Sequence, residues 1–482
     1  MLPSVAFSPL REVKLCRWSL FLLIVYAVYL FTALTAPFVG KAAAGVLLLL
    51  GLFSLYSLKK QHYALIKAEK WLLFGFALFS VVSIISFLYW PHTRESRMHL
   101  EDYATFIMLL PFYLLLRQFR FNFMLLLVMF SAAAVELGVL SLISTVARPS
   151  GAVNPMRYGN ISLVLAVIPL VAMLMIRNKA FSFKLFLIVA SVLGVVACFL
   201  TQSRGALLSI PFLAFLYGIY LHRAGHPRFL MALAIGAVLI VALASQQERV
   251  QQSLTSIDRY FQGHSGSALG ARFDMFKAAG ILIKEKPIWG HGLNSYSPLA
   301  TEIRKNTPGM NYEVGLWANP HNEILQVMVE KGVFGLITLL LLFAAPGYLF
   351  LQALRRADDS VAGQQVKFYA MSGLSLLTVY AVAGQSVALF EHDVFNHFFA
   401  LMVLLFASQI RVIGYVESRA DGELEGNWKL GGAVLVWGIQ DCKLFCVTAS
   451  LNIALQAVFG QDSEPVQGLL PISNGIVHFS EA

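Results

Sequence analysis

The sequence predicts an all-α protein that crosses the membrane about twelve times. Its 482 residues are 58% hydrophobic and only 13% charged, with a mean hydropathy of +0.70. Because this much apolar surface exceeds what one water-soluble core buries, the bilayer must act as the solvent. The apolar residues also form separate runs, each near the ~20 residues that a helix needs to cross the hydrocarbon.

Twelve runs qualify as membrane spans. The first follows three basic residues without a small-residue cleavage site, so we interpret it as a retained signal anchor. Residues 431–460 are excluded because Asp441 and Lys443 lie in mid-run, where charge is costly in lipid. The predicted spans are 18–37, 41–58, 71–90, 102–116, 121–146, 158–176, 184–201, 205–221, 229–245, 322–350, 368–390 and 394–411.

The charges between the spans predict the orientation of the chain. One set of alternate connections holds 17 Lys and Arg residues and the other holds five, leaving aside one long loop. Basic residues collect on the cytoplasmic side of a membrane protein. Both termini are therefore predicted in the cytoplasm, and the long loop outside.

The long loop sets the domain organisation. It is too long for a simple connection and contains RFDMFKAAGILIKEKP, a helical pattern bounded by Pro287, so we predict a small helical cap. The predicted division is nine spans in 1–244, the loop with amphipathic helices in 245–320, three spans in 321–412 and a cytoplasmic tail of unknown structure in 413–482.

Composition also excludes several kinds of site. The net charge of +10 is spread between the spans rather than gathered in one basic domain, so no nucleic-acid partner is predicted. No cofactor is predicted either. The cysteines show neither a disulfide framework nor a metal-ligand pattern; they are Cys16, Cys198, Cys442 and Cys446.

The segment WANPHNEILQVMVEKGVFG carries the main candidate for chemistry. Asn319 is predicted to cap a helix, with Pro320 at its first position and His321 and Asn322 in its first turn. A helix N-terminus attracts anions and biases a nearby imidazole towards its neutral form, which can accept a proton. The alternative is that His321 only caps or hydrogen-bonds at the membrane interface.

The surrounding arginines favour a functional role for His321. Six arginines are predicted outside, where the charge bias gives no reason for them, and guanidinium groups bind phosphate with paired hydrogen bonds. The alternative for the first three is that their side chains reach lipid headgroups. The six are Arg94, Arg97, Arg148, Arg157, Arg204 and Arg272.

Arg204 and Arg272 are the strongest candidates for phosphate binding. Arg204 lies in LTQSRGALLS, where a polar segment joins two spans with almost no loop, so its side chain is predicted to enter the protein. Arg272 opens the loop helix, and its alternative is a simple ion pair with Asp274 or Glu285. The tight turn PIWGHGLNSY follows, and its aromatic and glycine residues weakly suit sugar binding.

A polar cluster lies between the last two spans. Glu391, His392, Asp393 and His397 are of metal-ligand type, but the spacing HDVFNH does not match a ligand helix. Capping at the interface is the favoured interpretation, and no metal site is predicted.

Three motifs, in order, resemble the O-antigen ligase and polymerase superfamily of bacterial inner-membrane proteins. TQSRGALLS is similar to the family's Ser-Arg-Gly motif, and the helix and turn from Arg272 resemble its Arg, helix, Pro and Gly-x-Gly element. The resemblance covers about 205–412 well and the earlier spans by general pattern. The third motif, His-Asn, nine residues and Gly-x-x-Gly, is matched at His321, Asn322, Gly332 and Gly335.

The resemblance implies a GT-C-like glycosyltransferase that moves a glycan from undecaprenyl diphosphate to a sugar hydroxyl, by inversion and without a metal, at the periplasmic face of the inner membrane. Arg204 and Arg272 would stabilise the charge on the leaving diphosphate. His321 would accept the hydroxyl proton, or alternatively donate a hydrogen bond to the diphosphate. The secondary candidates for substrate binding are Arg157, Arg148 and Asn322.

Within the superfamily the favoured prediction is a lipopolysaccharide O-antigen ligase, with lipid A-core as acceptor. The form of the His-Asn motif and the single main external loop resemble ligases more than O-antigen polymerases. Protein O-oligosaccharyltransferases usually carry a longer external C-terminal region. A transporter or lipid flippase is the alternative from another class, but the long loop has no counterpart in the first half of the chain, as inverted repeats would require.

Overall fold

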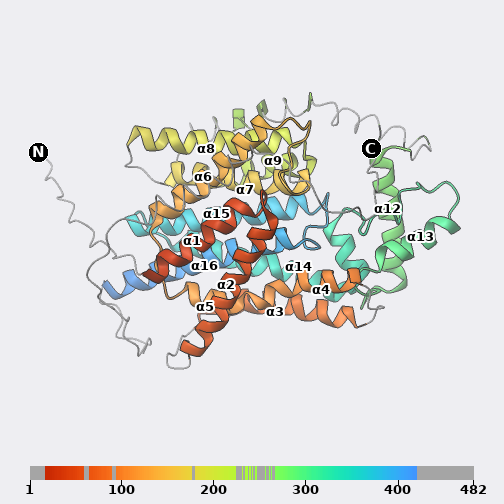
Figure 1. The fold of residues 1–482 in the computed structure, drawn as a ribbon, viewed down its shortest axis with the longest axis horizontal. Coiled ribbons are helices and arrows are strands. Elements are labelled where there is room, and N and C mark those ends of the chain that lie inside the picture. Colours follow the sequence, from red (N-terminus) through yellow and green to blue (C-terminus); the bar gives the residue numbers. More distant parts are fainter. Residues whose placement is uncertain are drawn as a thin grey trace, which may run out of the picture. The chain divides into compact units, whose positions relative to one another are not determined.

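The fold is all-α throughout the part of the chain that the structure describes (Figure 1). In this computed structural model no strand occurs in the described residues, which confirms the predicted fold class. The predicted span 229–245 lies largely outside them, and so does the predicted tail beyond Ala420. The described residues are 17–58, 65–88, 94–175, 180–223 and 266–420, with isolated positions between 231 and 262.

Eight helices in the described residues are long and apolar enough to cross a membrane, which confirms a multi-pass membrane protein. Two further apolar helices, α1 (Arg17–Thr32) and α2 (Pro37–Leu58), precede them. The count of twelve spans stays a prediction. The eight are α3 (Lys67–Phe87), α6 (Phe123–Ile143), α7 (Pro155–Met175), α8 (Phe181–Leu200), α9 (Arg204–Arg223), α14 (Glu323–Arg356), α15 (Val361–Ala383) and α16 (Asp393–Ala420).

The span predicted over 102–116 is corrected to two helices. They are α4 (Arg94–Met108) and α5 (Leu110–Leu116), and they are separated at Leu109. Pro111 lies in the first turn of α5, where its missing N–H and fixed φ suit a new helix start better than a continuing helix. α4 therefore begins with polar and charged residues that the predicted span left out, and His99 is one of these polar residues.

Successive spans run antiparallel, so helix ends gather at two faces of the bundle. At one face the start of α14 meets the end of α15, where the Glu323 N–H donates to the Gly384 carbonyl at 2.7 Å. At the opposite face the start of α3 meets the end of α5, where the Tyr113 hydroxyl donates to the Glu69 carboxylate at 2.7 Å. We call the first of these the His321 face, because His321 directly precedes α14.

Aromatic rings fix the loop between α15 and α16 in the core. The ring of Phe390 packs edge-to-face on Phe106 and Phe399, with centroids 5.5 Å and 5.3 Å apart. All three side chains are almost completely buried. Edge-to-face pairs add to the stabilisation that burial alone provides, so the residues that follow Phe390 start from a rigid anchor.

Two helices outside the spanning set form a small core of their own with the start of α14. α12 (Ala268–Glu285) begins at Ser267, whose side chain accepts the Gly270 N–H at 3.0 Å as an N-cap, and α13 is Tyr296–Asn306. α12 covers the helical pattern read from the sequence and ends before Pro287. The buried apolar residues of this core are Ala271, Met275, Ala278, Ala279, Leu282, Tyr296, Ala300, Val314 and Val329.

A turn that follows α12 fills a break in α14. Gly332 has φ 59° and ψ −153°, a conformation that interrupts the helix and is open mainly to glycine. The His291 N–H donates to the Val329 carbonyl at 2.7 Å, and the Val333 N–H donates to the Pro287 carbonyl at 2.8 Å. The turn thus satisfies backbone groups that the kink would leave unpaired.

Gly332→Ala is expected to destabilise the protein by about 1–3 kcal/mol, because a Cβ there would overlap the Ile288 carbonyl and lie 2.7 Å from the Trp289 nitrogen, at a φ that L-residues rarely adopt. Gly280→Ala is the matched control, since a Cβ at this α12 glycine meets nothing within 4 Å. Thermal unfolding in detergent measures both. Equal midpoints for the two variants would contradict a strained, tightly packed kink.

Candidate active site

His321 lies in a tight turn just before α14 rather than in its first turn. Its φ of 54° is left-handed, which is incompatible with a helix, so α14 cannot begin until the next residue. Asn322 is the N-cap, and its side chain accepts the Leu325 N–H at 3.0 Å. The Asn319 side chain accepts the His321 N–H at 2.9 Å instead of capping the helix. The predicted cap at Asn319 is therefore corrected to Asn322.

The His321 imidazole is held neutral. Burial, and then the positive charge of Arg272, lower its pKa from 6.5 to about 4. The ring lies beside Trp317, with centroids 5.7 Å apart, and its Nδ1 is buried without a hydrogen-bond partner among the described groups. A neutral imidazole at neutral pH can accept a proton. The predicted neutral state thus has burial as its main cause, with Arg272 second.

Arg272 belongs to the same site, because its charge acts on His321. It lies in the first turns of α12, half-buried on the small core described above. Asp274, weighed as an ion-pair partner from the sequence, accepts hydrogen bonds from the Tyr260 hydroxyl at 3.0 Å and the Asn311 N–H at 2.9 Å. A cation next to a neutral base is suited to an anionic group that approaches both.

Arg204 is the first residue of α9. The start of α9 and the start of α14 both contact the turn formed by residues 384–386. Gly205, the residue after Arg204, packs so closely on Ser386 that a Cβ there would overlap the Ser386 hydroxyl. On the other side of this turn, the Asn322 side-chain amide donates to the Gln385 carbonyl at 3.3 Å. Residues 384–386 therefore join the segment that carries Arg204 to the segment that carries His321.

Arg148 and Arg157 also lie on the His321 face. The Arg148 Nε donates to the Thr201 carbonyl at 3.1 Å, which ties the chain after α6 to the end of α8. A terminal nitrogen of Arg157 lies 2.9 Å from His392 Nδ1. Burial, and then the charge of Arg157, lower the pKa of His392 to about 3, so the neutral ring accepts this hydrogen bond. The backbone positions of all the arginines selected from the sequence for substrate binding thus lie on the His321 face.

The remaining members of the cluster between α15 and α16 have separate partners. Lys41 forms an ion pair of 2.5 Å with Asp393, the first residue of α16. His397 Nδ1 lies 2.7 Å from the Asp393 carbonyl. Glu391 is bonded to Asn319, whose Nδ2 donates to its Oε2 at 2.6 Å. The cluster therefore contacts several elements of the face, beyond the capping expected from the sequence.

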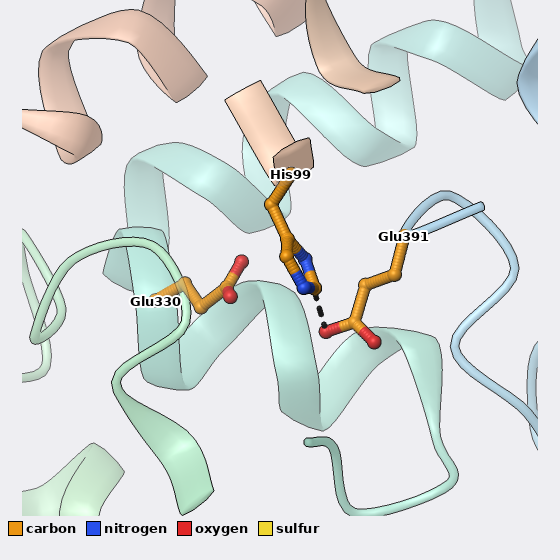
Figure 2. A group of neighbouring side chains, drawn as sticks. All are labelled: His99, Glu330 and Glu391. Carbon is orange, nitrogen blue, oxygen red and sulfur yellow. Dashed lines mark ion pairs between the residues drawn. The ribbon is translucent and has the colours of Figure 1, made fainter. Parts of the chain in front are cut away.

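A buried group of ionisable side chains underlies the site and was missed by the sequence reasoning. Figure 2 shows His99, Glu330 and Glu391 pointing towards one another from α4, α14 and the 389–392 loop. One ligand atom from each lies within 4.8 Å of the others, and His99 Nδ1 is 4.0 Å from Glu391 Oε1. The signal in the sequence was a Glu-Lys pair inside a predicted span.

Glu330 and Lys331 serve the packing of the kink. Glu330 Oε1 accepts the Asn294 N–H at 2.7 Å, which holds the turn after α12 against α14. The Lys331 ammonium lies 3.7 Å from Glu330 Oε2 and 3.2 Å from the centre of the Tyr103 ring. His99, Glu330 and Glu391 are residue types that bind cations. The ammonium group of Lys331 already supplies a positive charge beside these carboxylates.

A family model described as O-Antigen ligase matches residues 189–340, a segment that holds Arg204, Arg272 and His321. The chain is also 24% identical over 340 residues to an uncharacterized protein of Haemophilus influenzae, an alignment that covers 68% of this chain and 84% of that protein. The matched segment runs from α8 through the kink of α14.

Proposed function

We propose that the protein is a lipopolysaccharide O-antigen ligase, because residues 189–340 match the O-antigen ligase family model. It transfers a glycan from undecaprenyl diphosphate to a sugar hydroxyl of lipid A-core. The observation that carries the proposal is a half-buried His321 whose Nδ1 is buried and whose pKa is lowered by burial and by Arg272, on a face that also holds the first residue of α9, Arg204.

The proposed reaction is one inverting displacement. The acceptor hydroxyl oxygen attacks the anomeric carbon, the bond from that carbon to the phosphate oxygen breaks, and the hydroxyl proton passes to an imidazole nitrogen of His321. The leaving diphosphate gains negative charge, which Arg204 and Arg272 stabilise. Arg148, Arg157 and Asn322 are further proposed contacts to substrate. No metal takes part in the step.

The proposed location is the bacterial inner membrane, with both termini in the cytoplasm and the His321 face towards the periplasm. The excess of Lys and Arg in the connections of the opposite face supports this orientation. Glu69 on that face, for example, is paired with Arg117 at 2.9 Å. Both substrates are amphiphiles whose lipid tails stay in the bilayer while their sugars meet at His321.

Purified protein with undecaprenyl-diphosphate glycan and lipid A-core tests the proposal, with and without a chelator. Glycan attached to lipid A-core in both conditions is the expected result. Glycan joined only to glycan would make the protein a polymerase, and glycan attached to an added protein acceptor would make it a protein O-oligosaccharyltransferase. Movement of the lipid carrier across liposomes without any product would indicate a transporter or flippase.

The pH dependence of kcat/KM should report the lowered pKa of His321. Above about 4 the imidazole is neutral and accepts a proton, so activity is retained through the range near 6.5 where an ordinary histidine becomes charged, and is lost as the pH falls through about 4. Arg272→Gln should move this acid limb upwards, because one cause of the lowered pKa is removed. An acid limb near 6.5 in the unmodified protein would contradict a base whose pKa is lowered by its surroundings.

A further inference from the structure

Asn319 connects His321 to a buried acid on another element. Its Nδ2 donates to Glu391 Oε2 at 2.6 Å, while its Oδ1 accepts the His321 N–H at 2.9 Å. Asn319 and Glu391 are both buried, with exposed fractions of 8% and 4%. The two bonds use opposite ends of one amide, so they form a continuous chain from the loop between α15 and α16 to the backbone of His321.

The chain of bonds supports a backbone conformation that His321 would not adopt alone. A non-glycine residue at a φ of 54° is strained, and such strain persists only where the surroundings hold it. An asparagine amide has two nearly equivalent orientations, which present either oxygen or nitrogen to the His321 N–H. An acceptor at Glu391 Oε2 selects the orientation in which Nδ2 faces the acid and Oδ1 faces His321.

Glu391 is itself firmly placed. Its neighbour Phe390 is packed among aromatic rings, and the Phe390 N–H donates to the Glu323 carboxylate at 3.1 Å. Glu323 is the first residue of α14, two residues after His321. The loop is thus linked to the start of α14, and Glu391 provides the link that reaches the histidine, through Asn319.

The protonation of Glu391 fits an acceptor role. Burial, and then the charges of Glu330 and Glu323, hold the pKa of the Glu391 carboxyl well above its ordinary value. A protonated carboxyl still accepts a hydrogen bond through its carbonyl oxygen. Oε2 therefore accepts the Asn319 hydrogen bond whether the carboxyl is ionised or protonated. Glutamine reproduces this arrangement and leucine does not.

We propose that Glu391 is a positioning residue for the transfer reaction, acting through the Asn319 amide to hold His321 in its left-handed turn. The expected effect of Glu391 on glycan transfer rests on the proposed function. Its expected effect on the His321 turn rests only on the hydrogen bonds of Asn319. Glu391 does not take part in proton transfer. It lowers the barrier only by keeping the base where the acceptor hydroxyl arrives, since a shift of about 1 Å can cost roughly 100-fold in rate.

The test compares Glu391→Gln, Glu391→Leu, Asn319→Ala and the double variant Asn319→Ala/Glu391→Leu. We expect Glu391→Leu and Asn319→Ala each to lower kcat roughly 10- to 100-fold with KM for the glycan donor nearly unchanged, because orientation rather than binding is lost. Glu391→Gln should stay within about 3-fold of the unmodified protein. The double variant should be no slower than Asn319→Ala alone, since both changes break one chain of bonds.

Hydrogen–deuterium exchange of the peptide that contains 316–324 gives a readout without turnover. Exchange should be faster in Glu391→Leu and Asn319→Ala, and unchanged in Glu391→Gln and in the control Lys41→Ala, which removes an ion pair between the exposed Lys41 and the largely buried Asp393 on the same face. Asn319→Ala leaves Glu391 in place, so it decides the question even if Glu391→Leu does not fold.

Three results would overturn the positioning role. They are a loss in Glu391→Gln as large as in Glu391→Leu, an additive loss in the double variant, and unchanged exchange at 316–324 in Asn319→Ala. Absence of glycan transfer by the unmodified protein would instead refute the proposed function. The exchange comparison would then still show whether Glu391 and Asn319 hold the His321 turn.

Discussion

His321→Ala is expected to lower glycan transfer to lipid A-core by at least roughly 100-fold while the protein folds normally. General base catalysis contributes about 10²- to 10⁴-fold. Another neutral imidazole described on the His321 face, that of His392, is hydrogen-bonded to Arg157. The nearest alternative in sequence, His291, is buried with its Nε2 2.9 Å from the Leu282 carbonyl. The fold should persist because the buried Nδ1 of His321 makes no hydrogen bond to any group that the structure describes.

Rates of transfer with purified variants and saturating acceptor measure this effect. His222→Ala is the matched control, since His222 is an exposed histidine in the last turn of α9 and should leave the rate unchanged. His321→Gln separates the two roles left open by the sequence. Glutamine can donate a hydrogen bond to a diphosphate but is not a base, so substantial activity in His321→Gln would make His321 a hydrogen-bond donor instead.

Arg272→Ala and Arg204→Ala should each reduce transfer by roughly 100-fold, a loss comparable to that of one preorganised donor at a developing anion. Arg97→Ala should have little effect, because Arg97 is exposed on α4. Lysine should restore only part of the activity at Arg204 or Arg272, since an ammonium group lacks the planar pair of donors.

The measurement that distinguishes these arginines from general lipid anchors is kcat with a fixed donor concentration in defined micelles. Equal losses in the Arg97, Arg204 and Arg272 variants would contradict a specific diphosphate site. Arg272→Ala carries a second, separable effect, because loss of its charge also raises the pKa of His321. Comparison above pH 7, where the imidazole is neutral in either case, isolates the effect on the diphosphate.

Much of the fold followed from apolar runs and from glycine and proline positions. The runs predicted the spanning helices because a membrane helix must satisfy its own backbone and cover it with apolar side chains. The helical pattern ending before Pro287 predicted α12. The prediction of a single helix over 102–116 was wrong for two reasons. Apolar composition does not reveal the helix break before Pro111, and it does not reveal that α4 begins at Arg94, in a polar segment.

The sequence alone could select only the directly recognisable residues of the candidate site. Arg204 and Arg272 stood out because charge on the external side of a membrane protein needs a reason, and His321 stood out because it lies at a predicted helix start among these arginines. The cap at Asn319 was placed three residues early, since sequence alone does not reveal that His321 takes a left-handed φ. The partners of Glu391 could not be found either, because the contact with Asn319 joins residues 72 positions apart.

The turn seated in the α14 kink has a consequence for how such proteins diverge. Residues 287–292 supply hydrogen bonds to 329–333, and Gly290 and Gly332 each lack the room for a Cβ against the facing backbone. Neither of these two segments can change its length, or replace its glycine, without a matching change in the other. A chimaera that exchanges the external loop between relatives should therefore remain functional only when its junctions lie outside 287–335. The turn and the kinked part of α14 then come from the same relative.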